Sequence, residues 1–324
     1  MHTLEHLQAL AVELIESERY LNEPKSLFEP IDYAMRQGGK RLRPLLVLIA
    51  ADMFDEDVSK ARYAAAAVEI LHNFTLLHDD IMDNSPLRRG KPTVYKQFGN
   101  NQAILSGDAM FALAMQYGLK TESYAANAIA NVLSQASIDV CRGQALDMDF
   151  EQRDNVTIEA YIEMVRLKTS VLLGCSLKMG AIIARTEQAN IAALSDFGEF
   201  IGIAFQIKDD MLDCWSKVED FGKVKGKDIA DKKKTFLYLK ALETADGDMR
   251  NRLLSLYNDD SAEQNEKISR VIEIYERLNI KSIAQNVVED YTKRAMESLE
   301  RVSATEESKK NLIIFANKLL IREK

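Results

Sequence analysis

Apolar residues recur with a helical period along this chain. The stretch RVIEIYERLNIKSIAQNVVEDYTKRAMESLERV, near the C-terminus, alternates charged and apolar positions with the period of about 3.6 residues that packed amphipathic helices show. Alternating apolar and polar runs bounded by turn pairs, which mark hairpins, are not evident. The pattern predicts an all-α fold made of long helices.

Prolines and glycines mark the places where these helices can end. All five prolines lie within the first 92 residues, and the chain contains no glycine from Asp248 onward. We find no internal repeat, low-complexity segment or clear linker in the sequence. These features predict one domain over residues 1–324, built as a single large helical bundle.

Composition narrows the class of protein. The 324 residues are 47% hydrophobic and 28% charged, as in ordinary globular chains. No apolar run approaches the roughly 18 residues of a membrane span, and the N-terminal segment lacks the pattern of a signal peptide. We therefore expect a cytoplasmic protein. The formal net charge of -8 argues against a general nucleic-acid binder, which needs a basic surface.

Two aspartate clusters of identical spacing carry the candidate chemistry. Asp79, Asp80 and Asp83 follow a strongly apolar helical run, and the first and last of them share one helix face. The same spacing returns about 130 residues later, in DDMLD at 209–213. Neighbouring carboxylates repel one another unless a cation is present, and hard oxygen ligands suit Mg²⁺. A polar helix end is the alternative for each cluster, and the repetition disfavours it. The two clusters could form facing walls of one cavity.

Basic side chains occur where a diphosphate would need them. GGKRLRP at 38–44 places Lys40, Arg41 and Arg43 at a glycine-to-helix transition, where free backbone N–H groups favour an anion. Each basic segment alone is typical of a solvated surface. Together with two aspartate clusters they indicate two phosphate groups. The other basic segments are Arg88-Arg89, Lys168-Thr169 and the lysine-rich stretch 223–234.

Residues below the first cluster are candidates to contact a second substrate and an apolar tail. His72 lies seven residues before Asp79, roughly 10 Å lower along the helix. Leu71, Phe74 and Thr75 belong to the same helix and could line a pocket for the tail. Ordinary core packing is the alternative for all four of these residues.

These motifs together resemble the trans-isoprenyl diphosphate synthases, the polyprenyl synthetase family. GGKRLRP, EILHNFTLLHDDIMDNSPLRRGKPTVY, GQALDMDF, RLKTS, FQIKDDMLD and GKVKGKDIADKKKT occur in the family's order, between about residue 28 and about residue 235. The resemblance implies a bundle of mostly antiparallel helices around a deep central cavity, a Mg²⁺ cofactor in a set of three ions, and a homodimer. The implied reaction is head-to-tail (1'-4) condensation of an allylic diphosphate (dimethylallyl, geranyl or farnesyl) with isopentenyl diphosphate after Mg-assisted ionisation.

The resemblance also implies the roles of individual residues. The expected metal-binding residues are Asp79, Asp80, Asp83 and Asp209, with Asp210 and Asp213 resembling partners that act indirectly or through water. Residues matching the allylic diphosphate site are Arg88, Lys168, Lys223 and Lys233, with Thr169 and Gln206 nearby. Residues matching the isopentenyl diphosphate site are Gly39, Lys40, Arg43, His72 and Arg89. The expected catalytic group is Asp79, Asp80, Asp83, Arg88, Lys168, Asp209 and Lys223.

One position departs from the family's pattern. Lys232 stands where the family usually has glycine before the lysine of its G-K-x-T segment. Lys232, Lys233 and Lys234 are therefore alternatives for the lysine of that segment.

The resemblance also bears on product length and on rival functions. In the family that the chain resembles, an aromatic residue at the place of Phe74, five residues before Asp79, goes with short products, and a second aromatic at the next position goes with shorter ones. The next residue here is Thr75, so the resemblance implies a C20 product with C15 as the close alternative. The alternatives are a longer-chain synthase, a non-catalytic regulatory subunit, a terpene cyclase, and a di-iron bundle. The last is considered because Glu69 and His72 form its Glu-x-x-His element, although the sequence has no second copy.

Overall fold

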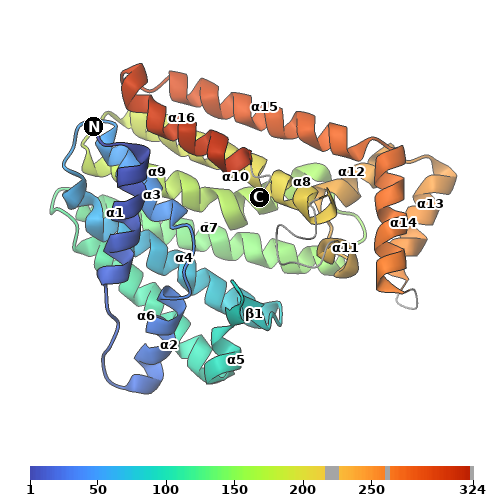
Figure 1. The fold of residues 1–324 in the computed structure, drawn as a ribbon, viewed down its shortest axis with the longest axis horizontal. Helices are drawn as coiled ribbons and strands as arrows, with labels where there is room; N and C mark the ends of the chain where they lie inside the picture. The colour runs from blue at the N-terminus through green and yellow to red at the C-terminus, as the bar shows by residue number, and fades with distance from the viewer. Residues whose placement is uncertain (216–225, 260–262, 322–324) are drawn as a thin grey trace. The chain divides into compact units, whose positions relative to one another are not determined.

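The computed structural model describes residues 1–215, 226–259 and 263–321 of the chain. This part is helical almost throughout, which confirms the all-α prediction (Figure 1). Its strands form one short hairpin, in which β1 (Leu87–Arg88) pairs antiparallel with β2 (Lys91–Pro92). In the part of the chain that the structure describes, no helix is long and apolar enough to cross a membrane.

The chain forms two compact units, each with its own residues. The first comprises Met1–Val140, Val171–Glu199 and Glu297–Phe315, and the second comprises Cys141–Ser170, Phe200–Met296 and Ala316–Lys324. Four helices have residues in both units: α7 (Ala126–Gln152), α10 (Gln188–Trp215), α15 (Ile280–Glu300) and α16 (Glu306–Leu320). The single domain expected over residues 1–324 stays a prediction.

The first unit is organised around α3 (Leu42–Asp52), whose sequence LRPLLVLIAAD is apolar on every side. Each residue from Pro44 to Asp52 is buried, as expected of a helix hydrophobic all round. α3 packs against α4 (Arg62–Met82) and α9 (Val171–Ile183), and α4 packs against α6 (Asn100–Leu119). The unit also contains α1 (Leu4–Ser17), α2 (Lys25–Met35), a 3₁₀ turn (Val58–Ala61) and α5 (Val94–Phe98).

The second unit has its own core, in which Phe236, Tyr257 and Tyr275 are almost fully buried. This core lies among α12 (Phe236–Thr244), α13 (Gly247–Asn258) and α14 (Gln264–Arg277), which pack on one another. α8 (Ile158–Val165) packs against α12, and the short α11 (Lys227–Ala230) packs against α14. The core therefore holds the ends of several short helices in fixed places.

A single turn of π-helix, Arg166–Ser170, follows α8 and contains the motif RLKTS. Two glycines let neighbouring helices approach this turn closely. A Cβ atom on Gly143 of α7 would lie 2.3 Å from the backbone nitrogen of Lys168, and one on Gly202 of α10 would lie 2.6 Å from Cα of Ser170. Backbone atoms cannot move aside like a flexible side chain, so both positions require glycine. π-helical turns of this kind are frequent at functional sites.

Candidate active site

The first aspartate cluster lies at the C-terminal end of α4, in the first unit. The helix is buried from Ala64 to Leu71, which fixes the direction in which its last turn projects. Asp80 is buried with 3% of its surface exposed, Asp79 is partly exposed, and Asp83 follows the last helical residue and is exposed. The three carboxylates therefore differ in their access to solvent.

Asp80 is paired with Arg88 of the β1–β2 hairpin. The Nε atom of Arg88 donates to both carboxylate oxygens at 2.9 Å, and its Nη2 lies 2.7 Å from Oδ1. The same Nη2 lies 3.8 Å from Oδ2 of Asp79. Burial raises the pKa of Asp80, and the Arg88 guanidinium opposes that shift. Arg88 thus binds the two adjacent aspartates together at the helix end.

The chemistry of these carboxylates fits Mg²⁺ only together with ligands that a substrate supplies. Across the described residues no three His, Cys, Asp or Glu side chains group as a ready metal site. Asp80 is paired with Arg88. Mg²⁺ is usually held by one or two carboxylates, with water and phosphate oxygens completing its octahedron. Asp79 and Asp83, one turn apart, match that requirement best.

Arg41 of the GGKRLRP segment is directed into the core. Its Nη1 donates to Oε1 of Glu69 at 2.7 Å and its Nη2 donates to the carbonyl of Met35 at 2.5 Å. The side chain of Asn73 also donates to Oε1 of Glu69, at 3.3 Å. Both bonds go to Oε1 and tie Glu69 to Arg41 and Asn73, which disfavours the di-iron alternative. The expectation that Arg41 contributes to the anion site does not fit its position.

Gly39 and Arg89 lie against each other. Gly39 has a φ of 124°, and a Cβ atom there would lie 2.7 Å from Cζ of Arg89. Arg89 itself adopts a left-handed conformation, with a φ of 53°, and its Nη1 donates to the carbonyl of Gly38. The glycine pair thus provides a backbone cradle for this guanidinium. Lys40, the next residue, is exposed.

Arg43 and His72 belong to the same electropositive region of the first unit. Nε of Arg43 is buried and has no hydrogen-bond partner among the described residues, and burial lowers the pKa of Arg43 to about 10. Burial, followed by the positive charges of Arg43 and Arg89, holds the pKa of His72 well below its usual value. The imidazole is therefore neutral near pH 7. A half-buried guanidinium with one buried, unpartnered nitrogen, beside a neutral imidazole, is suited to bind an anion.

Phe74 faces α6. Its ring lies 5.7 Å from the ring of Phe111 on α6, and 5.0 Å from the ring of His78 in an edge-to-face contact. The hydroxyl of Thr75 donates to the carbonyl of His72 at 2.8 Å, and Leu71 is fully buried. The rings of Phe74 and Phe111 form an aromatic contact between α4 and α6, about one turn and a half before the first aspartate cluster on α4. Leu71 lies in the core, which matches the packing alternative for that residue.

The π-helical turn of the second unit brings three predicted residues together. Nζ of Lys168 lies 2.6 Å from Oδ2 of Asp147 on α7, which pairs the lysine with the GQALD motif. The hydroxyl of Thr169 donates to Oε1 of Gln206 on α10 at 3.4 Å. In the same motif, Nε2 of Gln144 is buried and has no partner within the described ranges.

The second aspartate cluster lies near the end of α10, and its three members differ. Asp209 is partly exposed, whereas Asp210 is buried with 4% of its surface exposed. Both oxygens of Asp210 accept hydrogen bonds, Oδ1 from Gln206 at 3.1 Å and Oδ2 from the hydroxyl of Tyr161 at 2.5 Å. Burial raises the pKa of Asp210. Direct metal binding by Asp210 does not fit these contacts, and the indirect role implied by the resemblance fits better.

Asp213 and the lysine-rich segment follow on the chain. Oδ2 of Asp213 accepts from the backbone nitrogen of Asp228 at 3.1 Å. Lys232 has a left-handed φ of 56°, at the position where the family usually has glycine. Nζ of Lys234 donates to the carbonyls of Phe150, at 2.7 Å, and Arg153. Lys234 thus caps the C-terminal end of α7 by donating to these carbonyls.

Lys233 is the remaining described alternative for the lysine of the G-K-x-T segment. Lys223, which the family resemblance assigns to the allylic diphosphate site, lies outside the described residues.

Sequence reasoning missed the supporting roles of three residues, of which it had named only Glu69, as part of the Glu-x-x-His element. They are Glu69, which pairs with Arg41; Tyr161, which donates to Asp210; and Tyr257, whose hydroxyl donates to the carbonyl of Lys233 at 2.6 Å. Glu69 and Tyr161 lie at positions where the helical pattern predicts plain core. The available signal was a charged residue at a helical position where the pattern expects an apolar one. That signal could have identified Glu69 but neither Tyr161 nor Tyr257.

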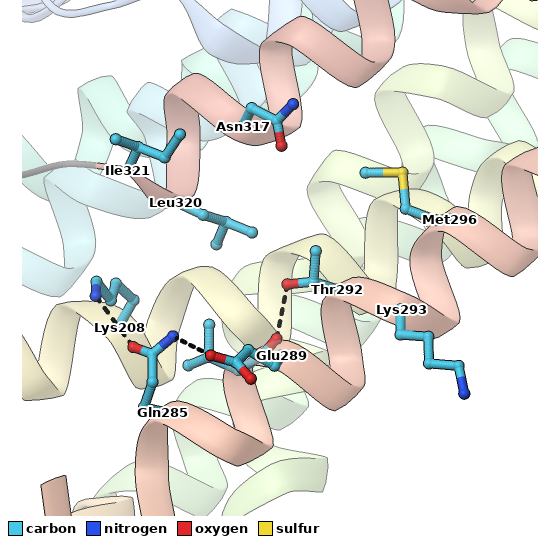
Figure 2. Close-up of a pocket in the computed structure, with 10 residues that line it drawn as sticks. Lys208, Gln285, Glu289, Thr292, Lys293, Met296, Asn317, Leu320 and Ile321 are labelled. Carbon is cyan, nitrogen blue, oxygen red and sulfur yellow. Dashed lines mark hydrogen bonds between the residues drawn. The ribbon is translucent and has the colours of Figure 1, made fainter. Parts of the chain in front are cut away.

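A separate pocket of about 540 Å³ lies in the second unit, between α10, α15 and α16 (Figure 2). Nζ of Lys208 donates to Oε1 of Gln285 at 3.3 Å, and the amide of Gln285 donates to Glu289 at 2.9 Å across one wall. Leu320 and Ile321 form the opposite side. None of the residues predicted from the sequence lines this pocket.

Comparisons with known proteins identify the same family as these motifs. The family model for polyprenyl synthetase matches residues 24–275. The chain is 38% identical over 301 residues to the short chain isoprenyl diphosphate synthase of Methanothermobacter thermautotrophicus, covering 93% of this chain and 91% of that relative. It is also 38% identical over 284 residues to the geranylgeranyl diphosphate synthase of Sulfolobus acidocaldarius, covering 86% and 85%.

A solved structure of a geranylgeranyl pyrophosphate synthase superposes with a TM-score of 0.94 at 40% sequence identity, over the full length of both chains. The family match covers well over half of the chain, and two relatives share more than a third of their residues with it across most of their length. The chain belongs to the polyprenyl synthetase family.

Proposed function

We propose that this chain is a Mg²⁺-dependent prenyltransferase that condenses an allylic diphosphate with isopentenyl diphosphate head to tail. The observation that carries the proposal is the pair of neighbouring groups in the first unit. Asp79 and Asp80 are joined by Arg88, and Arg89 next to it lies on the Gly38-Gly39 backbone close to Arg43 and His72. The first group can bind one diphosphate through Mg²⁺ and Arg88, and the second group can bind another diphosphate through cationic side chains. The names of the two relatives, a short chain isoprenyl diphosphate synthase and a geranylgeranyl diphosphate synthase, support the same reaction.

The residues of this chain would share the work as follows. Asp79, Asp83 and Asp209 would hold Mg²⁺, which neutralises the charge that develops on a departing diphosphate. Arg88 and Lys168 would bind the allylic diphosphate as its C–O bond breaks. The double bond of isopentenyl diphosphate then forms the new carbon–carbon bond, and the proton lost from it passes to the released diphosphate. No side-chain nucleophile is needed.

Isopentenyl diphosphate would be held by Lys40, Arg43 and Arg89. Gly39 has no side chain and therefore leaves room for the guanidinium of Arg89. Neutral His72 would donate a hydrogen bond to the same group without adding charge, because burial and, after it, the surrounding arginines keep its pKa low. The buried Nε of Arg43 gains a partner when the diphosphate binds. This requirement for a second diphosphate separates the proposal from a terpene cyclase, which uses one.

We propose a C20 product for this enzyme. The rings of Phe74 and Phe111 form an aromatic contact between α4 and α6. A prenyl tail that grows away from Asp79 would meet these two rings. Thr75 adds no second ring on α4, which favours C20 over C15. The relatives named as geranylgeranyl diphosphate synthases support the same length.

We further propose that the enzyme is a homodimer. On α6, Leu105 and Leu119 are 58% and 54% exposed and lie about four turns apart on the same side of the helix, and Ile104 beside them is 44% exposed. Apolar surface of this kind favours contact with another protein. Sedimentation velocity tests the proposal: the native chain should sediment as a dimer and Leu105→Glu as a monomer, whereas a monomeric native chain would contradict it.

Release of diphosphate tests the proposed reaction. The purified chain should release inorganic diphosphate only when Mg²⁺, an allylic diphosphate and isopentenyl diphosphate are all present. Release from the allylic substrate alone would indicate a cyclase. Absence of release with every allylic starter would indicate a non-catalytic subunit and would contradict the proposal.

A further inference from the structure

The second aspartate motif has three carboxylates with three different environments. Asp210 accepts the backbone N–H of Phe236 on Oδ2 at 3.3 Å, in addition to the bonds from Tyr161 and Gln206. Phe236 is the first residue of α12. The carboxylate of Asp210 is therefore bonded to the start of that helix, inside the core.

Asp213 makes the equivalent contact with another helix. Its Oδ2 accepts the backbone N–H of Asp228 at 3.1 Å, and its carbonyl accepts the N–H of Gly226 at 2.9 Å. Asp228 lies in the first turn of α11. The first N–H groups of a helix have no partner within the helix, so an outside carboxylate satisfies them and is favoured by the helix dipole.

Between the two anchored helix starts lies the lysine segment, which we define as residues 231–235. Its backbone is bonded on both sides: the N–H of Lys233 donates to the carbonyl of Asp228 at 2.9 Å, and the carbonyl of Lys233 accepts from the hydroxyl of Tyr257 at 2.6 Å. Lys234 is fixed separately, at the C-terminal end of α7. The position of Lys233 thus depends on where α11 and α12 begin.

We propose that Asp210 and Asp213 are positioning residues for the lysine segment, and that Tyr161 positions Asp210. On this account Asp209 is the one member of the motif that meets the metal, and the other two carboxylates hold the starts of α12 and α11 so that Lys233 projects toward the diphosphate. The inference rests on the proposed function, because the position of the lysine segment matters to catalysis only if a diphosphate binds at this site.

Binding of inorganic diphosphate without Mg²⁺ tests this division of roles. Calorimetry in EDTA measures the contribution of the cationic side chains alone. Tyr161→Phe should weaken this binding about fivefold to tenfold, since the hydrogen bond that holds the buried carboxyl group of Asp210 is lost. Asp209→Asn should not weaken it in EDTA, because the substitution removes a negative charge near the anion, and should weaken it only when Mg²⁺ is added. Equal binding by Tyr161→Phe and the native chain would overturn the inference.

Tyr238→Phe is the matched control. Tyr238 stacks on Tyr257 in the same core, and within the described residues its hydroxyl makes no hydrogen bond to Asp210. Removal of that hydroxyl should leave diphosphate binding within about twofold of the native value. A loss as large as that of Tyr161→Phe would assign the effect to core packing and overturn the inference.

A second pair of variants separates positioning from metal binding even if Tyr161→Phe folds poorly. Asparagine keeps the oxygen that accepts the N–H of Asp228 but lacks the charge that a metal ligand needs, and alanine lacks both. For the allylic substrate, kcat/KM of Asp213→Asn should exceed that of Asp213→Ala by about tenfold, with the difference in KM more than in kcat. Equal losses in the two variants would identify Asp213 as a metal ligand and overturn the inference.

The binding assay needs no turnover, so the two proposals fail in different ways. If the native chain makes no prenyl product, the proposed function fails. If the native chain is active but Tyr161→Phe binds diphosphate normally in EDTA, only the positioning role fails.

Discussion

Arg41 and Glu69 form a buried ion pair, in which Nη1 lies 2.7 Å from Oε1 and the side chains are 4% and 3% exposed. Arg41 lies between Lys40 and Arg43 on the chain, and Glu69 lies one helical turn before His72. The pair therefore fastens the anion-binding segment to α4. A buried pair of this kind is stable only while both partners are present.

Replacement of Glu69 by glutamine should destabilise the fold. Arg41 would remain buried without an opposite charge, which costs roughly 3–5 kcal/mol in the free energy of unfolding. Urea denaturation followed by circular dichroism measures the change. Glu273→Gln is the matched control, because its pair with Arg277 is half-exposed and contributes about 0.5 kcal/mol or less. Equal stability of the two variants would show that the Arg41–Glu69 pair does not anchor this segment.

Replacement of Lys232 by glycine should stabilise the fold. Lys232 has a φ of 56°, and a residue with a Cβ atom in this conformation costs roughly 1–2 kcal/mol that glycine avoids. Thermal unfolding should therefore show a higher midpoint for Lys232→Gly. Lys227→Gly, within α11, should lower the midpoint, because glycine is unfavourable inside a helix. A lower midpoint for both variants would contradict the left-handed conformation at Lys232.

The pKa of His72 gives the enzyme a specific dependence on pH. Its pKa is held well below the ordinary value of about 6.5 by burial and by the surrounding arginines. As pH falls below about 6.5, the unfolded chain binds a proton that the folded chain does not, so stability decreases until the folded pKa is reached.

The free energy of unfolding of the native chain should therefore fall between pH 7 and pH 5.5 by up to about 1.4 kcal/mol per pH unit more than that of His72→Gln. Chemical denaturation at several pH values measures both slopes. Identical slopes in the two proteins would show that His72 titrates normally in the folded state.

Product length should depend on both members of the aromatic contact between α4 and α6. Phe74→Ala and Phe111→Ala each remove a ring from the contact at 5.7 Å, so each should lengthen the product by at least one isoprene unit. Chromatography of the dephosphorylated products measures the chain length. Phe98→Ala is a control, because that ring packs on Tyr33 of α2. An unchanged product from active Phe74→Ala would remove Phe74 as the determinant.

The helices and the spacing of the aspartates could be predicted because both are local properties of the sequence. A period of about 3.6 residues and an interval of four residues need no tertiary information. The proximity of Gly39 to Arg89 followed only from the family resemblance, because a glycine pair followed by a distant arginine has no local signature.

The rest depended on partners far away in the sequence. Arg41 was expected near an anion, but its left-handed backbone turns it toward Glu69, 28 residues away. Asp210 looked like Asp209, yet its partners Tyr161 and Phe236 lie 49 and 26 residues away. Tertiary packing decides which carboxylate of a cluster faces solvent, and the interval between aspartates in the sequence carries no information on that packing.

The most direct measurement of the central claim is the product formed from labelled isopentenyl diphosphate. With Mg²⁺ and farnesyl diphosphate, the native chain should form a C20 prenyl diphosphate, and Asp79→Ala should form almost none while its helical circular-dichroism signal persists. An Asp79→Ala variant as active as the native chain would contradict the metal assignment. A native chain that leaves isopentenyl diphosphate unchanged with dimethylallyl, geranyl and farnesyl diphosphate would contradict the proposed reaction itself.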